Sequence, residues 1–214
     1  MFDFIADIRK EYILKTLSES DAEDNPIAQF EKWWKEAVHS EIIEPNAMTL
    51  ATSSSDGLPA ARIVLLKGFD QKCFVFYTNY NSFKGQQLAE NPRACLVFFW
   101  KEIERQVRIT GIVSKVNPAS SDEYFHSRPS LSRFGAVASP QSQVIESREW
   151  LELRVEKLTE DLGSEDPKRP EHWGGYIVRP VTIEFWQGRS NRLHDRLQYS
   201  LEEGGGWKIE RLAP

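Results

Sequence analysis

Residues 94–101 read ACLVFFWK and residues 105–116 read RQVRITGIVSKV, and these two runs decide the fold class. The first is apolar up to its last residue, while the second alternates apolar and polar side chains as a half-buried strand does. Further short β-rich runs lie at 48–53, 61–67, 73–78, 176–178, 181–186, 193–200 and 207–211. Because helices do not alternate regularly with these runs, the pattern predicts a mainly β fold, an antiparallel barrel with peripheral helices.

Turn and cap residues separate the predicted elements. Asp56-Gly57 predicts a hairpin turn, and the three glycines at 204–206 predict another. Helices are expected over the first forty-odd residues, where Pro26 follows Asn25, over 82–90 with Ser82 as the cap, within 118–137, and over 147–162. Trp33, Trp34 and Trp150 are expected to be core residues of these helices. We therefore expect one globular domain, with an N-terminal helical segment at 1–44 and the barrel at 45–214.

Composition excludes several classes of protein. Hydrophobic residues make up 40% of the 214 residues and aromatic residues 12%, too many for a disordered chain. The apolar runs are too short to cross a bilayer, and the start, MFDFIADIRKEY, lacks the continuous apolar stretch of a secretory signal. Cys73 and Cys95 lie inside strand-like runs and are interpreted as buried thiols in a reducing compartment. A cytoplasmic protein without a membrane partner is expected.

Charge and motifs narrow the function further. The 27 basic and 32 acidic side chains give a net charge of −5, which disfavours broad binding to nucleic acid. Glycine-rich dinucleotide and phosphate loops, the H-E-x-x-H zinc motif and the G-x-S-x-G nucleophile motif are all absent from the sequence. The four histidines are scattered, so no metal site is expected. Any cofactor is therefore held by a less common arrangement.

Two groups of cations flank predicted strands. The free N–H groups of a helix beginning after Ser82, with Lys84 beside them, can bind a phosphate, although an ordinary cap with a solvated lysine is the simpler interpretation. Arg62 and Lys67 lie on opposite faces of one strand by parity, with Lys67 near or past its end. They are either edge residues that extend to solvent or ligands of two different anions, and both readings remain open.

Two further segments carry polar groups in suggestive patterns. Arg192, His194 and Arg196 follow one another at every second residue, so a strand would place all three on one face. Such neighbours favour an anion or an electron-rich ring between them. Tyr124, Arg128 and Ser132 are the donor types that a phosphate monoester needs, although this composition is common in loops. Trp186 is either a core residue or a wall for a ring-shaped ligand.

These segments together resemble the pyridoxamine (pyridoxine) 5′-phosphate oxidase family. The matching stretches are RIVLLK at 62–67, YTN at 77–79, S-x-K-G at 82–85, NPR at 91–93, RQV at 105–107, YFHSRP at 124–129, QS at 141–142, WGG at 173–175, FWQG at 185–188, RLHDR at 192–196 and ERLAP at 210–214. The resemblance implies a six-stranded FMN-binding split β-barrel, antiparallel and Greek-key-like. It also implies a homodimer with FMN at the subunit interface.

The resemblance assigns roles to particular residues. FMN would be bound by Arg62, Ile63, Val64, Leu65, Leu66, Lys67, Tyr77, Thr78, Lys84, Gln106, Gln141, Ser142, Trp186 and Arg196. The substrate would be bound by Lys67, Tyr124, Arg128, Ser132, Arg192, Leu193 and His194, with Arg192 and His194 as the catalytic residues against the pyridine ring. The implied reaction transfers a hydride from C4′ of pyridoxamine or pyridoxine 5′-phosphate to the flavin. Dioxygen (O2) then reoxidises the flavin and gives hydrogen peroxide, with ammonia released from the amine.

One position departs from the family pattern. The family usually has arginine between the serine and the lysine of its phosphate loop, whereas this chain has Phe83. The alternative functions are a non-catalytic flavin- or pyridoxal phosphate-binding protein and a nicotinamide-dependent flavin reductase. The second phosphate-binding set, with Lys67, Tyr124 and Arg128, argues against a carrier, and nothing in the chain marks a dinucleotide site.

Overall fold

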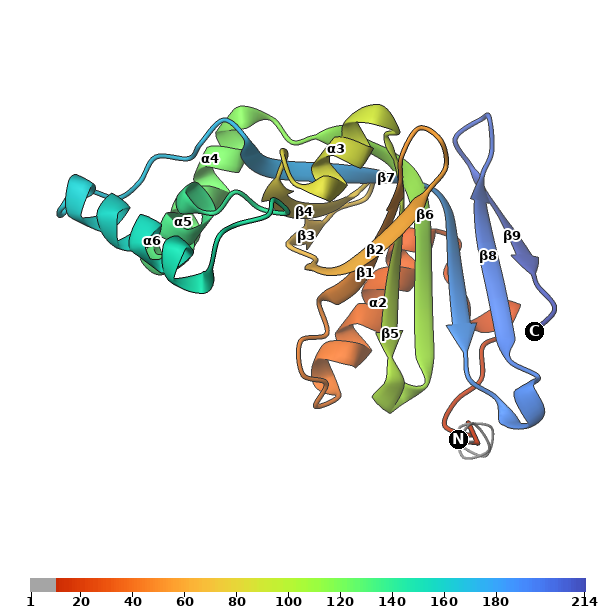
Figure 1. The fold of residues 1–214 in the computed structure, drawn as a ribbon. Coiled ribbons are helices and arrows are strands. Elements are labelled where there is room, and N and C mark those ends of the chain that lie inside the picture. The colour runs from red at the N-terminus through yellow and green to blue at the C-terminus, as the bar shows by residue number, and fades with distance from the viewer. Residues whose placement is uncertain (1–10) are drawn as a thin grey trace, which may run out of the picture.

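The computed structural model describes residues 11–214, and the nine strands within them form one antiparallel sheet (Figure 1). The strands are β1 Ala47–Ser53, β2 Pro59–Leu65, β3 Gly68–Phe69, β4 Phe74–Asn79, β5 Arg93–Trp100, β6 Arg105–Lys115, β7 Trp173–Gln187, β8 Asp195–Leu201 and β9 Trp207–Arg211. Their order is β2-β1-β5-β6-β7-β4-β3, and β8 and β9 extend the sheet from β7. The expected mainly β architecture is confirmed.

The barrel closes at a bend between β2 and β3. These strands are separated by two residues, yet β2 pairs with β1 while β3 pairs with β4 at the other end of the strand order. At the bend the backbone N–H of Lys67 donates to the carbonyl of Val75 (2.8 Å). One bent segment therefore joins the two edge strands of the order, β2 and β3.

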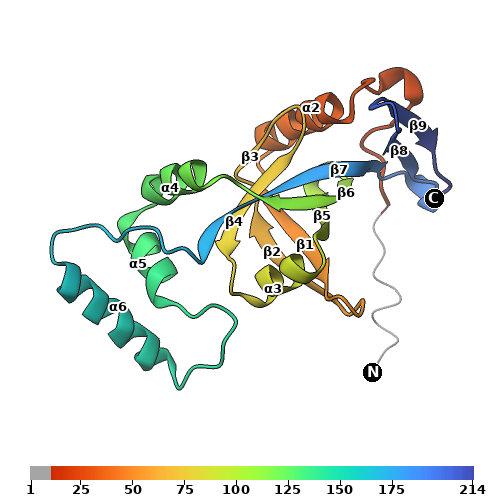
Figure 2. The ribbon, with the colours of Figure 1, turned by 90° about the horizontal axis from the view of Figure 1, so that it is seen from above.

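Helix α2 (Pro26–His39) covers one side of the barrel, opposite α3 (Phe83–Glu90), as Figure 2 shows. It begins at Pro26 because the side chain of Asn25 accepts the N–H of Ile27 (2.8 Å). Phe30 is fully buried, and its ring packs edge-on against Phe74 with centroids 4.9 Å apart. The aromatic face of α2 thus joins the barrel core.

The prediction that the first forty-odd residues are helical is only partly correct. Helix α2 lies inside the expected segment 1–44, but the described residues before it contain only the short helix η1 (Glu19–Asp21). Residues 1–10 lie outside the described part of the chain. Backbone N–H groups at 13 and 14 donate to Glu104 Oε2 (2.9 and 3.0 Å), and that of Leu17 donates to Asp195 Oδ2 (3.1 Å). These partners in other elements replace the internal hydrogen bonds of a helix.

Three helices, α4 (Pro118–Ser127), α5 (Ser130–Ala138) and α6 (Arg148–Leu162), extend from the barrel at the end opposite β8 and β9 (Figures 1 and 2). They agree with the predicted helical stretches. Trp33 is buried as expected, but Trp150 on α6 is only half-buried, with the guanidinium of Arg154 4.8 Å from its ring centre. Within residues 11–214, no helix is long and apolar enough to cross a bilayer.

Strand β7 corrects another prediction. The runs 176–178 and 181–186 were expected to be separate strands, but they belong to one strand of 15 residues that continues through Pro180. A register shift opposite Thr110 and Gly111 accommodates the proline, which has no N–H to donate to the ladder. Gly111 is required there because a Cβ atom would lie 2.3 Å from the carbonyl oxygen of Arg179.

The substitution Gly111→Ala should therefore destabilise the barrel. We expect the free energy of unfolding to fall by ~2–3 kcal/mol, because neither backbone can retreat without breaking the β6–β7 ladder. Gly135→Ala is the matched control, since nothing lies within 4 Å of its added Cβ. Urea unfolding at one fixed protein concentration measures both variants. Equal stability of Gly111→Ala and Gly135→Ala would contradict the account of this bulge.

Candidate functional site

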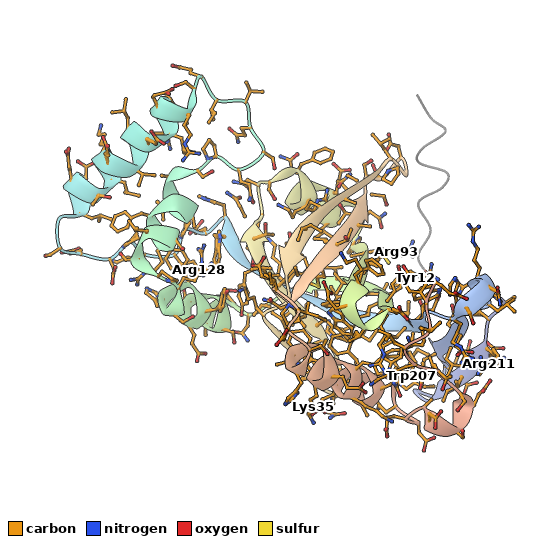
Figure 3. The ribbon with its side chains drawn as sticks, turned by 90° about the horizontal axis from the view of Figure 1, so that it is seen from below. Tyr12, Lys35, Arg93, Arg128, Trp207 and Arg211 are labelled. Atoms are coloured by element: carbon orange, nitrogen blue, oxygen red, sulfur yellow. The ribbon has the colours of Figure 1, made fainter. Side chains whose placement is uncertain are left out.

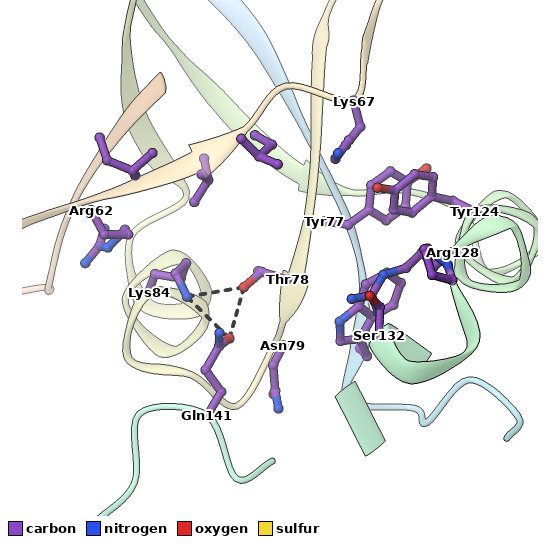
Figure 4. A pocket seen from close by; sticks show the side chains of 15 residues that line it. Arg62, Lys67, Tyr77, Thr78, Asn79, Lys84, Tyr124, Arg128, Ser132 and Gln141 are labelled. Atoms are coloured by element: carbon purple, nitrogen blue, oxygen red, sulfur yellow. Dashed lines mark hydrogen bonds between the residues drawn. The ribbon is translucent and has the colours of Figure 1, made fainter. Parts of the chain in front are cut away.

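A cavity of about 620 Å³ opens between β2, β4, α3 and the α4–α5 pair (Figure 4). Its walls are formed by Arg62, Ile63, Val64, Leu65, Lys67, Tyr77, Thr78, Asn79, Lys84, Tyr124, Arg128, Pro129, Ser132, Gln141 and Trp173. Four of these residues are cationic and none is acidic. The cavity is therefore suited to a ligand that carries negative charge.

Lys84 lies in the first turn of α3, at one end of the cavity. Ser82 caps this helix by accepting the N–H of Gly85 (3.4 Å), as the sequence predicts. The ammonium of Lys84 donates to Thr78 Oγ1 (3.2 Å) and Gln141 Oε1 (3.4 Å), as Figure 4 shows. It also donates to Ser82 Oγ (3.3 Å), so all three acceptors are neutral. Burial, with the positive charge of Arg62 nearby, lowers the pKa of Lys84. A buried cation without a counter-charge is typical of an anion site.

Arg62 approaches the same end of the cavity from β2. Its Nη1 donates to the carbonyl of Leu50 (3.1 Å) and to Thr52 Oγ1 (2.6 Å), and the Thr52 hydroxyl donates to Gln87 Oε1 (2.6 Å). Thr52 and Gln87 thus orient the guanidinium, and neither was predicted as a site residue. The β1–β2 register, which places Leu50 opposite Arg62, is the information that was missing.

Stacked rings form the opposite wall. The rings of Tyr77 and Tyr124 lie nearly parallel with centroids 3.9 Å apart, and Trp173 is stacked 5.7 Å from Tyr77. The guanidinium of Arg128 lies 4.7 Å from the centre of the Trp173 ring. Arg128 Nη1 is buried without a hydrogen-bond partner, and burial lowers the pKa of this side chain. An anionic ligand would satisfy that donor.

Trp173 was not predicted as a site residue. It was quoted only within the stretch WGG at 173–175, and the two glycines that follow it are the signal that could have indicated it. A Cβ at position 175 would lie 2.8 Å from Tyr77 Cε1, so Gly175 allows the Tyr77 ring to lie against β7. A glycine pair after an aromatic residue can thus indicate a wall where backbone and rings pack closely.

The other predicted site residues form a separate cluster. Gln106, Trp186 and Arg196 lie directly opposite one another on β6, β7 and β8, and the His194 ring is 4.5 Å from that of Trp186. None of these residues lines the cavity. Tyr12 packs edge-on against Trp186 (5.7 Å), and Figure 3 shows Tyr12 and Arg128 in different parts of the molecule.

The strand β7 sets the separation of the two clusters. Thr78 in the cavity pairs with Gly174, whereas Trp186 lies twelve residues further along the same strand. At about 3.3 Å per residue this corresponds to ~40 Å of strand. The predicted site residues therefore fall into two clusters, one near each end of β7.

The prediction that a strand places Arg192, His194 and Arg196 on one face is wrong. Strand β8 begins only at Asp195, and Arg192 ends the short helix η3 (Ser190–Arg192) with a φ of 61°. The N–H of Arg189 donates to His194 Nδ1 (3.1 Å), which fixes a turn in place of a strand. Arg196 Nε donates to Glu184 Oε1 (2.9 Å), so an acidic side chain already compensates its charge.

Three other predicted residues lie away from the cavity surface. Leu66 is buried in the core at the bend after β2, and Leu193 is 68% exposed. Ser142, exposed and with a φ of 71°, follows Gln141 without lining the cavity. Among the described residues there is also no group of three or more metal-ligating side chains.

Comparison with known families gives two matches that together span most of the chain. The family profile described as "Pyridoxamine 5'-phosphate oxidase" matches residues 34–160. The profile described as "Pyridoxine 5'-phosphate oxidase C-terminal dimerisation region" matches residues 173–214. The cavity falls mainly in the first match and the Trp186–Arg196 cluster in the second.

Curated relatives are similar over the full length. Proteins named pyridoxine/pyridoxamine 5′-phosphate oxidase from Trichormus variabilis and Paraburkholderia phymatum are both 56% identical to this chain. The matches cover 98% of this chain and 98% and 99% of those proteins.

Solved structures agree with the fold. PhzG from Burkholderia lata 383, solved with tetrahydrophenazine-1-carboxylic acid, superposes with a TM-score of 0.87 at 30% identity and covers 94% of this chain and 99% of its own. A pyridoxamine 5′-phosphate oxidase-related, FMN-binding protein from Nostoc punctiforme has a TM-score of 0.69 at 18% identity, covering 86% and 97%. The second likeness concerns the fold alone.

Proposed function

This chain belongs to the pyridoxamine 5′-phosphate oxidase family, and we propose that it is an FMN-dependent oxidase of pyridoxamine and pyridoxine 5′-phosphates. It would form pyridoxal 5′-phosphate with O2 as the electron acceptor, releasing hydrogen peroxide and, from the amine, ammonia. The observation that carries the proposal is one cavity with two separate cationic ends and no carboxylate in its wall. Two phosphates, one from a cofactor and one from a substrate, match that charge pattern.

The residues present fit the flavin phosphate. Arg62 and Lys84 converge on the first turn of α3, where backbone N–H groups add further donors. Both side chains are held by neutral partners, and burial lowers the pKa of each, so an anion between them would be favoured. When bound, FMN supplies the redox chemistry, accepting two electrons from the substrate and passing them to O2. The protein supplies placement and charge.

The substrate phosphate is assigned to the other end of the cavity. Lys67 approaches it from the bend between β2 and β3, Arg128 from the end of α4 and Ser132 from α5, and the Tyr124 hydroxyl belongs to the same wall. Lys67 follows β2 at the bend that closes the barrel, so barrel closure places it. A guanidinium, an ammonium and two hydroxyl groups are sufficient to bind a phosphate monoester.

A complete site requires two protomers in this proposal. The β7 strand separates the cavity from the cluster of Gln106, Trp186 and His194 within one chain. In a two-fold dimer the cavity of one protomer can face the cluster of its partner, which gives two equivalent sites. The match of residues 173–214 to a dimerisation region supports this arrangement. FMN would then lie at the subunit interface.

His194 and Arg192 would contact the pyridine ring from the partner side. Burial, with the positive charge of Arg192, lowers the pKa of His194, which favours the neutral form of its ring. Because His194 Nδ1 accepts the N–H of Arg189, the proton of the neutral ring is on Nε2, which can donate to the substrate. Arg192 is exposed and cationic, suited to orient the substrate and stabilise negative charge near its reacting carbon.

Anaerobic spectroscopy tests the proposed function. Pyridoxamine 5′-phosphate added to the FMN-loaded protein should bleach the flavin band near ~450 nm, and air should restore it. Arg192→Ala should retain FMN but bleach about a hundredfold more slowly or worse, because substrate orientation is lost. Arg148→Ala, which removes an 80% exposed arginine paired with Glu152, is the matched control and should behave as the unaltered protein.

Other outcomes identify the alternatives. Bound flavin that never bleaches with the amine or the alcohol would indicate a carrier. Flavin that bleaches only with a reduced nicotinamide would indicate a reductase. Loss of FMN from Arg192→Ala, with normal bleaching of the flavin that remains, would contradict the role given to Arg192.

Phe83 leads to a separate prediction about cofactor affinity. It occupies the first position of α3 beside Lys84, is 49% exposed and does not line the cavity. Phe83→Arg should tighten FMN binding about tenfold or more, because a charged hydrogen bond to phosphate contributes ~1.5–3 kcal/mol. Fluorescence titration of the apoprotein with FMN measures the change.

Ala89→Arg is the control for Phe83→Arg. It adds the same charge to an exposed position near the other end of α3 and should change FMN affinity by less than about twofold. Unchanged affinity in Phe83→Arg would mean that Arg62, Lys84 and the helix N-terminus already saturate the phosphate.

A further inference from the structure

Trp173 lies at the centre of the aromatic wall without a role in the function proposed so far. It is 6% exposed and begins strand β7 opposite Asn79. Its ring stacks on that of Tyr77 (5.7 Å) and is parallel to that of Tyr124 within 5°. The indole therefore contacts one ring from the predicted flavin set and one from the predicted substrate set.

A cation also lies beside the indole. The guanidinium carbon of Arg128 lies 4.7 Å from the ring centre of Trp173, within the range of a favourable cation–π contact. Arg128 follows helix α4, and its Nη1 is buried without a hydrogen-bond partner. This half-buried cation thus lies over the face of the Trp173 ring.

The backbone and the ring of Trp173 are both held by contacts with other residues. Arg169 Nη1 donates to the carbonyl of Trp173 (2.6 Å), while Arg169 Nε donates to Asp122 Oδ1 on α4 (2.6 Å). Phe125, fully buried on α4, packs edge-on against the indole at 5.2 Å. One ion pair and one aromatic contact therefore join the start of β7 to the helix that precedes Arg128.

We propose that Trp173 is a positioning residue for the substrate phosphate, acting through Arg128. The indole provides a rigid plane that holds the guanidinium in the cavity with a free donor directed at the phosphate. Trp173 would need no contact with the substrate itself. This inference rests on the proposed function, because it assumes that the Arg128 end of the cavity receives the phosphate of the vitamer.

The test measures phosphate preference without turnover. The probes are 4-deoxypyridoxine 5′-phosphate and 4-deoxypyridoxine, which lack the oxidisable group at C4′, and the readout is the ratio of their affinities for FMN-loaded protein. Trp173→Leu should lower the preference for the phosphorylated probe about tenfold. Trp173→Phe, which keeps an aromatic face and protects folding, should lower it by no more than about threefold.

A double-mutant cycle identifies the route of the effect. Arg128→Ala should lower the preference at least as much as Trp173→Leu, and the double variant should be no worse than Arg128→Ala alone. Trp150→Leu is the matched control: it removes an indole that carries Arg154 at 4.8 Å outside the cavity, and it should leave the preference unchanged.

Contrary results separate the positioning role of Trp173 from the proposed oxidase function. Full additivity in the double variant, or an unchanged preference in Trp173→Leu, would overturn the positioning role while leaving the proposed function intact. A preference that depends on Trp173 and Arg128 in a protein that oxidises neither vitamer would support the positioning role and overturn the proposed oxidase. No preference in the unaltered protein would overturn both.

Discussion

Strand β7 runs unbroken from Trp173 to Gln187 because β6 passes it at Gly111 without a side chain in the way. The bulge at Pro180 bends the ladder but does not end it. One end of β7 supports the stacked wall of the cavity, and the other carries Trp186 between β6 and β8. The geometry of both clusters of predicted site residues therefore depends on the continuity of a single strand.

The cationic residues of the cavity have no carboxylate partner among the residues that line it. Lys84 and Arg62 are desolvated near each other and are paired with hydroxyl and carbonyl oxygens where a carboxylate would stabilise them more. Arg128 has the same character at the other end. Elsewhere the protein compensates its charges: Glu184 pairs with both Arg108 and Arg196. The cations of the cavity thus differ from Arg108 and Arg196, which pair with a carboxylate inside the sheet.

Local signals predicted much of this molecule. The Ser82 cap, the Asp56-Gly57 turn and the alternation after Arg105 each depend on neighbours in sequence, and the structure contains the elements they predicted. The uninterrupted β7 strand was missed, because only the opposing Gly111 makes Pro180 tolerable in it. The turn at 189–194 was missed for a similar reason, since it depends on the Arg189–His194 hydrogen bond. The division of the predicted site residues into two clusters depends on the pairing of β6, β7 and β8, which neighbours in sequence do not specify.

In the proposed dimer each site combines the cavity of one protomer with the Trp186–Arg196 cluster of its partner, which includes Arg192. Mixing of subunits tests this arrangement directly. Arg128→Ala alters the cavity and Arg192→Ala alters the cluster, so each variant alone should be nearly inactive at low substrate concentration. Mixed and reassociated, half of the dimers should contain one unaltered site, which restores about a quarter of full activity. A mixture no more active than its components would contradict this arrangement, because it would mean that each chain completes its own site.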